Sequence, residues 1–97
     1  MTYFTTIMEA LREEISRQGH HADDELLQYY ALLVLTTGVQ TTARDVHNAW
    51  AAWRTVTRPD HPDLVPFSEF PEETKKHDIP YALVIQTVAA GLEGNES

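Results

Sequence analysis

The sequence contains no cysteine and only four glycines among its 97 residues. The lack of cysteine excludes disulfides, thiolate nucleophiles and sulfur-ligated zinc. The glycines, at positions 19, 38, 91 and 94, are too scattered for a glycine-rich phosphate loop. Basic residues are also scarce: the sequence has seven Lys and Arg but fifteen Asp and Glu, which gives a net charge of −8. Such an acidic chain would repel a nucleic-acid polymer or an anionic membrane.

Long apolar runs are absent as well. No segment approaches the ~20 apolar residues of a membrane span, and the first residues, MTYFTTIMEALREEIS, do not resemble a signal peptide. We therefore expect a cytoplasmic protein with no membrane partner. The length predicts one domain, residues 1–90, followed by a flexible tail, residues 91–97. A domain this small leaves much surface exposed, so we also predict a homo-oligomer, most simply a symmetric dimer.

Apolar residues recur at helical spacing in four segments, which predicts helices at 3–17, 24–37, 43–57 and 79–90. Thr42 and Asp45 form a capping-box signature at the start of the third segment. The fold class that follows is all-α: a compact single-domain bundle of four main helices. Its predicted core is Phe4, Ile7, Leu11, Leu27, Tyr30, Leu33, Val34, Val46, Trp50, Leu64, Phe67, Tyr81, Ile85 and Val88.

The connector between the third and fourth predicted helices is unusually apolar. Residues 61–70, HPDLVPFSEF, hold two prolines and two phenylalanines but no glycine. A flexible linker would be polar and glycine-rich. This proline-rich segment, which we call the strap, is either packed against the core or forms one wall of a binding site.

Catalytic and metal-binding patterns are weak. The chain has no serine in a nucleophile elbow, and adjacent His20 and His21 cannot aim two ligands at one ion as an i, i+4 pair does. We interpret them, with the acids that follow, as a solvated loop and helix start. We therefore predict no catalytic residues, no metal, no cofactor and no enzymatic activity.

The third predicted helix carries the most informative cluster. Arg44, His47, Trp50 and Arg54 share a broad face, and Trp53 lies beside it. Residues 44–58 are also the only net-positive segment of the chain. Aromatic planes beside guanidinium groups suit a planar heterocycle that carries a phosphate. Alternatively, both tryptophans are core, the histidine is bonded to a backbone carbonyl, and the arginines pair with surface acids.

Two stretches carry a resemblance to a known family. DVHNAWAAWR (45–54), followed by HPDLVPFSEFPEETKKHD (61–78), resembles the ryanodine-receptor repeat domain, over about 35 residues. That family has a His-x-x-Trp-Ala helix with a downstream Arg, then a His-Pro-x-Leu-Val-Pro-(Tyr/Phe) segment with a Lys and an Asp beyond it. YYALLVL and DVHNAWAAW are also similar to segments of small actinobacterial phage proteins. The family's Gly-Trp-Thr-Tyr-Gly hairpin is shortened here to TVTRPD, and Ile79 replaces its final Arg.

The resemblance implies a strap that packs over the tryptophan helix, with Leu64, Val65 and Phe67 in the core and His61 and Pro62 at the edge of a cleft. It also implies a non-enzymatic receptor for a small anionic, nucleotide-like ligand, cyclic nucleotides included. In a phage, such a protein would sequester a host immune second messenger as an anti-defence sponge.

For the ligand site we predict an anion held by arginines, histidines as hydrogen-bond donors, and a ring stacked on an aromatic side chain. The predicted ligand-binding residues are Tyr30, His47, Trp53, Arg54, Arg58 and His61. The alternative function is a helical protein–protein interaction adaptor of a phage with no small-molecule ligand. A ligand site would leave Arg54 and Arg58 unpaired beside a cleft, whereas an adaptor would expose a flat apolar patch.

Overall fold

The computed structural model describes residues 3–96, with side chains up to residue 92. Its long helices are α1 (Tyr3–Arg17), α2 (Asp24–Thr36), α3 (Ala43–Thr57) and α5 (Ile79–Glu96). The short elements are η1 (Gly38–Gln40), η2 (Phe67–Glu69), α4 (Glu72–Lys75) and η3 (Lys76–Asp78). No strand occurs among residues 3–96, and the predicted all-α class with four main helices is confirmed.

The helix ends follow local sequence signals. At the start of α3, the backbone N–H of Thr42 donates to Asp45 Oδ2 at 2.9 Å, and the Asp45 N–H donates to Thr42 Oγ1 at 3.2 Å. This is the predicted capping box. After α1, Gly19 adopts a positive φ of 79°, and the N–H of His20 reaches back to the carbonyl of Ile15 at 3.0 Å.

The predicted end of the last helix at residue 90 is wrong. Helix α5 continues to Glu96, so the predicted tail of residues 91–97 is helical up to that residue. Gly91 does not end the helix, because a glycine inside a helix costs only about 1 kcal/mol relative to alanine. Leu92 beyond it still packs against the core. Ser97 lies outside the described residues, as do Met1 and Thr2.

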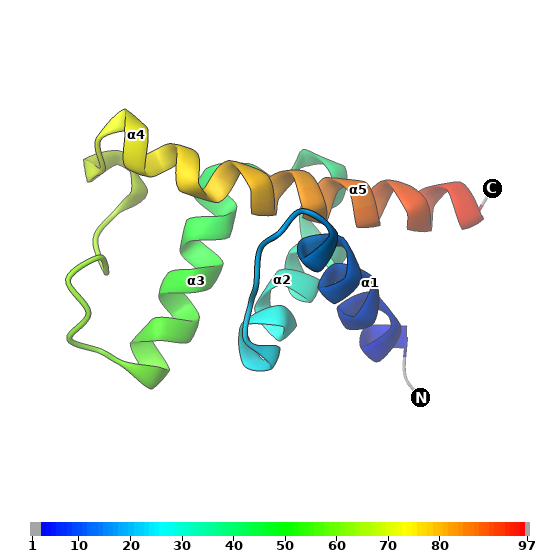
Figure 1. The fold of residues 1–97 in the computed structure, drawn as a ribbon, viewed down its shortest axis with the longest axis horizontal. Coiled ribbons are helices and arrows are strands. Elements are labelled where there is room, and N and C mark those ends of the chain that lie inside the picture. Colours follow the sequence, from blue (N-terminus) through cyan, green and yellow to red (C-terminus); the bar gives the residue numbers. More distant parts are fainter. Residues whose placement is uncertain (1–2, 97) are drawn as a thin grey trace.

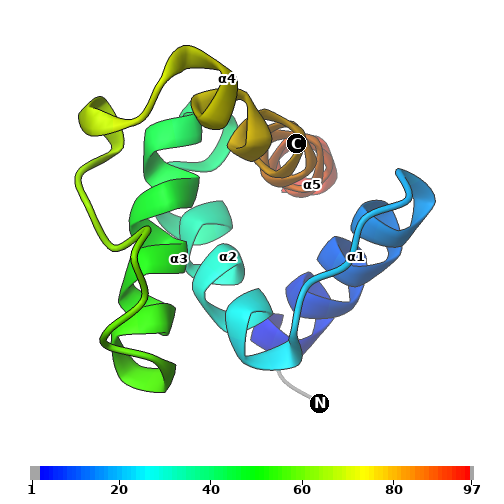
Figure 2. The same ribbon diagram turned by 60° about the vertical axis from the view of Figure 1, so that its left-hand side comes forward.

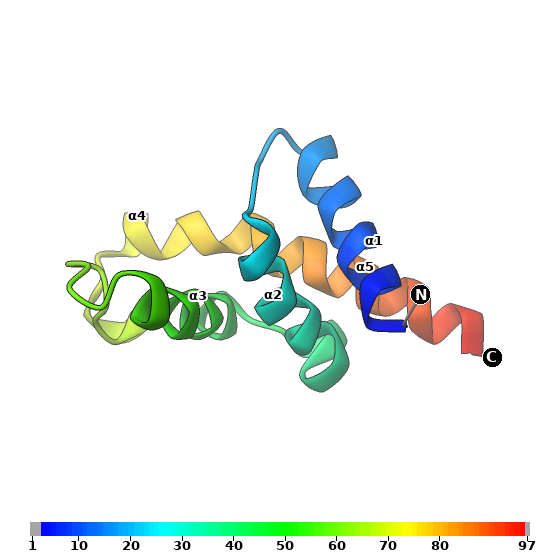
Figure 3. The ribbon, with the colours of Figure 1, turned by 90° about the horizontal axis from the view of Figure 1, so that it is seen from below.

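Helix α5 runs along the long axis of the molecule and packs against α1, α2 and α3 (Figure 1). Figures 2 and 3 show α2 between α1 and α3, with the three gathered on one side of α5. The radius of gyration is 13.3 Å, close to the about 12.5 Å expected for a compact chain of this length. In the described part of the chain, no helix combines the length and the apolar character needed to cross a membrane.

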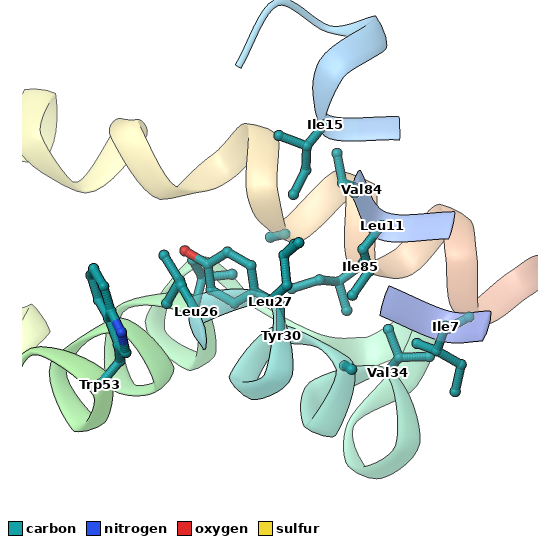
Figure 4. Packing of buried hydrophobic residues seen from close by; sticks show 14 residues of the cluster. Ile7, Leu11, Ile15, Leu26, Leu27, Tyr30, Val34, Trp53, Val84 and Ile85 are labelled. Atoms are coloured by element: carbon teal, nitrogen blue, oxygen red, sulfur yellow. The ribbon is translucent and has the colours of Figure 1, made fainter. Parts of the chain in front are cut away.

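Half of the predicted core is buried. The confirmed residues are Ile7, Leu11, Leu27, Tyr30, Val34, Val46 and Ile85, most of which are labelled in Figure 4. The other predicted residues are only half-buried and pack around that cluster or on the strap: Phe4, Leu33, Trp50, Leu64, Phe67, Tyr81 and Val88. The core also contains apolar residues that were not on the predicted list: Ile15, Leu26, Ala31, Trp53, Ala82, Val84 and Ala89.

Of the two tryptophans of α3, Trp50 was predicted for the core and Trp53 for the ligand site, but the structure buries Trp53 more deeply. Trp53 is 6% exposed and belongs to the core, whereas Trp50 is half-buried. Trp53 lies seven residues after Val46, two helical turns along the same face, and that face meets α2. Figure 4 shows Trp53 at one end of the buried cluster, far from Ile7 at the other.

The strap runs back alongside α3 towards α4 (Figure 1). His47 on α3 anchors the strap. Its side chain is 3% exposed, and its Nε2 lies 2.7 Å from the carbonyl oxygen of Val65. The His47 ring also contacts Phe67 at 6.0 Å and meets Phe70 edge-on at 4.9 Å between centroids. Because the strap covers the outside of α3, Leu64, Val65 and Phe67 keep one side open and are half-buried, not core as expected.

Candidate functional site

A cavity of about 400 Å³ opens between the start of α2, α3, the strap and η3 with the first turn of α5. Pockets of roughly 300–1,000 Å³ are typical of small-molecule sites. Its aromatic lining residues are Tyr30, Trp50, Trp53, Phe70 and Tyr81. Its titratable and charged lining residues are His21, Asp23, His47, Arg54, Asp63, His77 and Asp78.

Arg54 is the one Arg or Lys among the described residues that line this cavity. Its guanidinium carbon lies 4.3 Å from the centroid of the Trp53 ring, a cation–π contact that holds the side chain in place. Within the described part of the chain, the side chain of Arg54 makes no hydrogen bond or ion pair, and its Nε is buried without a partner. An unpaired guanidinium at a cavity wall is the arrangement expected of an anion-binding group.

Four of the six predicted ligand-binding residues line this cavity: Tyr30, His47, Trp53 and Arg54. Arg58 and His61 are not among its lining residues. Arg58 is exposed and lies 3.9 Å from Asp60, as the surface-pair alternative expects. The His61 ring meets Trp50 edge-on at 5.1 Å, and its Nδ1 accepts the backbone N–H of Asp63 at 3.1 Å.

His47 uses one ring nitrogen to hold the strap. A carbonyl oxygen can only accept, so Nε2 carries the proton that His47 donates to Val65. This is the backbone-bonded histidine that the alternative interpretation predicts. Nδ1 is therefore the ring nitrogen left for any further partner.

Two tyrosines meet at the wall opposite the strap. The rings of Tyr30 and Tyr81 lie 5.8 Å apart between centroids. Burial raises the pKa of Tyr30 far above its ordinary value, with smaller contributions from Asp78 and Tyr81. Burial and then Asp78 also raise the pKa of Tyr81, whose hydroxyl donates to the carbonyl of His21 at 3.3 Å. Both hydroxyls stay protonated at neutral pH, and that of Tyr30 has no hydrogen-bond partner among the described residues.

Asp78 is the carboxylate nearest to these rings. It ends η3, is half-buried, and has no hydrogen bond or ion pair from its side chain within the described residues. Burial raises the pKa of Asp78, while His47 and His77 beside it act in the opposite direction. In the sequence, Asp78 matches the Asp of the ryanodine-receptor repeat resemblance, but it was not among the predicted ligand-binding residues.

A metal centre does not emerge from these groups. Among the described residues, no set of three or more His, Asp or Glu side chains is placed to hold a metal ion. His21 and Asp23, in the segment considered for metal binding, are exposed and lie 3.7 Å apart.

Comparison with known proteins places the chain in a family. Residues 2–90 match the model of a family described as "Domain of unknown function (DUF7701)". The chain belongs to this family. No curated protein and no solved structure matches it.

In this DUF7701 protein, charge is unevenly spread around the cavity. Besides Arg54, three carboxylates line the cavity, of which Asp23 and Asp63 are exposed and Asp78 is half-buried. Three of the aromatic residues that line the cavity were not among the predicted ligand-binding residues: Trp50, Phe70 and Tyr81. Trp50 and Tyr81 were placed in the core because both fit an apolar stripe, and Phe70 lies in a segment that has no helical period.

Proposed function

We propose that this protein is a non-enzymatic binding module for a small nucleotide-like ligand, cyclic nucleotides included. The observation that carries the proposal is Arg54, unpaired and fixed on Trp53, at the wall of a cavity with five aromatic rings. A guanidinium can hold phosphate oxygens with paired hydrogen bonds, and aromatic faces take a planar base.

The stacking surface that we propose differs from the first expectation. Trp53 is buried and the Arg54 guanidinium lies over its ring, so Trp53 serves mainly to position the arginine. The half-buried rings of Trp50 and Phe70 are better placed to take a base from the open side of the cavity.

The mode of action that we propose is sequestration. It rests on the resemblance to ryanodine-receptor repeats and to small phage proteins, for which ligand capture without turnover is the implied role. A phage copy of this chain would lower the free concentration of a host second messenger. Mass analysis of the released ligand checks this point, because a sponge returns its ligand unchanged.

The binding proposal can be tested with native mass spectrometry and calorimetry against nucleoside monophosphates and cyclic nucleotides. Arg54→Ala should weaken binding about tenfold or more, since a hydrogen-bonded charge is lost. The affinity of Arg54→Lys should lie between those of the wild type and Arg54→Ala, because the charge stays but the forked hydrogen-bond donor is lost. Arg58→Ala is the matched control, being exposed and outside the cavity. No binding by the wild type, or full binding by Arg54→Ala, would show the proposal to be wrong.

The adaptor alternative is supported by a different surface. Leu32 and Leu35 are exposed one helical turn apart on α2, and Val39 is exposed on η1, which follows α2. If the wild type binds no nucleotide, this surface becomes the better candidate for the protein's function.

The same surface bears on the predicted homo-oligomer. Light scattering should give a dimer that Leu32→Glu with Leu35→Glu dissociates, if copies pack there. A monomer at high concentration, with and without nucleotide, would contradict the prediction of self-association.

A further inference from the structure

The polar groups of the cavity are distributed along α3. Arg54 lies seven residues after His47, about 10 Å along the helix axis. Asp78 lies at the His47 end, close enough for the two groups to interact electrostatically. The cavity thus has a cationic group towards one end and a carboxylate towards the other, a separation that a nucleoside monophosphate spans from phosphate to base edge.

Asp78 is poorly accommodated by the protein alone. Its side chain is half-buried, faces the cavity and accepts no hydrogen bond within the described residues. Fully buried carboxylates are normally paired or hydrogen-bonded, whereas a half-buried carboxylate without a protein partner depends on water or a ligand for a hydrogen bond. The neighbouring tyrosines do not supply one, because Tyr81 donates to the His21 carbonyl and the Tyr30 hydroxyl has no partner.

A carboxylate has a definite hydrogen-bond preference. Its two oxygens only accept, side by side, so they fit a ligand edge that presents two adjacent donors. Among the common nucleobases, guanine presents such an edge, with N1–H next to the 2-amino group. Adenine and cytosine pair one amino donor with an acceptor, and uracil has one N–H between two carbonyls.

Building on the proposed function, we infer that the ligand is a guanine nucleotide, with the guanine N1–H and 2-amino group on Asp78 and the phosphate on Arg54. The base then lies among the half-buried rings of the cavity wall, and the Tyr30 hydroxyl is free to donate to it. Because burial raises the pKa of Asp78, the carboxylate is disfavoured in the empty protein, and two hydrogen bonds from the base would offset that penalty.

The test uses GMP, IMP and XMP with the full chain, by calorimetry near neutral pH. IMP is GMP without the 2-amino group, so wild type should bind GMP about tenfold or more tightly than IMP. Asp78→Asn keeps the shape but replaces one acceptor by a donor. It should lose the preference for GMP and prefer XMP, whose C2 carbonyl can accept from the amide. Asp60→Asn is the matched control, an exposed carboxylate that does not line the cavity, and should keep the wild-type order.

The outcomes separate this inference from the proposed function. Equal binding of GMP and IMP that still depends on Arg54 would overturn the guanine assignment and leave the binding module intact. An Asp78→Asn variant that is folded by circular dichroism and keeps the wild-type order would overturn it too. If no nucleotide binds to the wild type, both proposals are wrong. A preference for XMP that appears only in Asp78→Asn would support the contact directly, since a merely structural change would weaken all three ligands together.

Discussion

The two ends of this molecule are built differently. Where α1, α2 and α5 meet, the large side chains are 0–1% exposed, as for Ile7, Leu11, Leu27 and Ile85. On the other side, α3 and the strap leave the rings of Trp50 and Phe70 half-buried at a cavity. Three polar side-chain groups there have no hydrogen-bond or ion-pair partner among the described residues: Arg54, Asp78 and the Tyr30 hydroxyl. A close-packed interior stabilises the fold, whereas unpaired polar groups around a cavity are characteristic of binding sites. We therefore expect substitutions in the interior to lower stability most, and substitutions of the unpaired cavity groups to change stability little.

The largest effect should come at the boundary of the two regions. Trp53→Ala removes a buried ring that packs in the core and also carries Arg54, and should lower the free energy of unfolding by about 4 kcal/mol. Trp50→Ala removes a half-buried ring and should cost about 2 kcal/mol. Urea unfolding measures both. A larger loss of unfolding free energy for Trp50→Ala than for Trp53→Ala would mean that Trp50, and not Trp53, connects the interior with the cavity.

A leucine pair compares the two regions directly. Leu27 is 0% exposed in the interior, and Leu27→Ala should cost about 3 kcal/mol, because a cavity is left behind. Leu64 lies half-buried on the strap, and Leu64→Ala should cost about 1 kcal/mol. Thermal and urea unfolding give the two values. Equal losses would mean that the strap is as integral to the fold as the helices.

The sequence predicted the helices well because their ends have local causes. The Thr42 and Asp45 capping box and the positive-φ Gly19 act within a few residues, so a reader of the chain can find them. It predicted burial less well. The α5 sequence is apolar nearly all round, so no stripe singled out Ala82 and Ala89. On α3, Trp50 and Trp53 are three residues apart and point in directions only about 60° different, which periodicity does not resolve.

Three of the four predicted residues that line the cavity lie on one helix, and the fourth, Tyr30, lies on α2. His47, Trp53 and Arg54 come from the α3 pattern, and all three line the cavity. Asp78 approaches Tyr30 from 48 positions away in the chain, and that proximity depends on how η3 and α5 dock on α2 and α3. A local pattern holds no information about such a contact. Charge alone also favoured Arg58, which the end of α3 turns towards Asp60.

A smaller effect should follow from loosening the strap. His47→Ala removes the hydrogen bond to the Val65 carbonyl and the ring contacts with Phe67 and Phe70. In the variant, the Val65 carbonyl can accept a hydrogen bond from water instead. The free energy of unfolding should therefore fall by only about 1–2 kcal/mol. Limited proteolysis should cut within residues 61–70 sooner than in wild type, while helix content by circular dichroism stays unchanged. A strap as resistant as in wild type would show that His47 does not anchor it.

The smallest effect, and the most informative about the cavity, is the pH dependence of Asp78→Asn. Burial raises the pKa of Asp78 in the folded chain above its unfolded value. The native state therefore binds that proton more tightly, and the stabilisation is complete below the unfolded pKa, near 3.9, and is lost as the pH rises through the folded pKa. Asparagine carries no such penalty, so the variant should unfold at a slightly higher temperature than wild type at pH 7. The difference should shrink towards pH 3, and it is limited throughout by His47 and His77, which act on the pKa of Asp78 in the opposite direction to burial. Tyr30 and Tyr81, the other groups facing Asp78, stay neutral throughout this range.

Thermal unfolding of the wild type and of Asp78→Asn across pH 3–7 measures this difference. A variant that is less stable than wild type at pH 7 would mean that Asp78 supports the fold. That result would contradict the division of the molecule into a stabilising interior and a binding cavity.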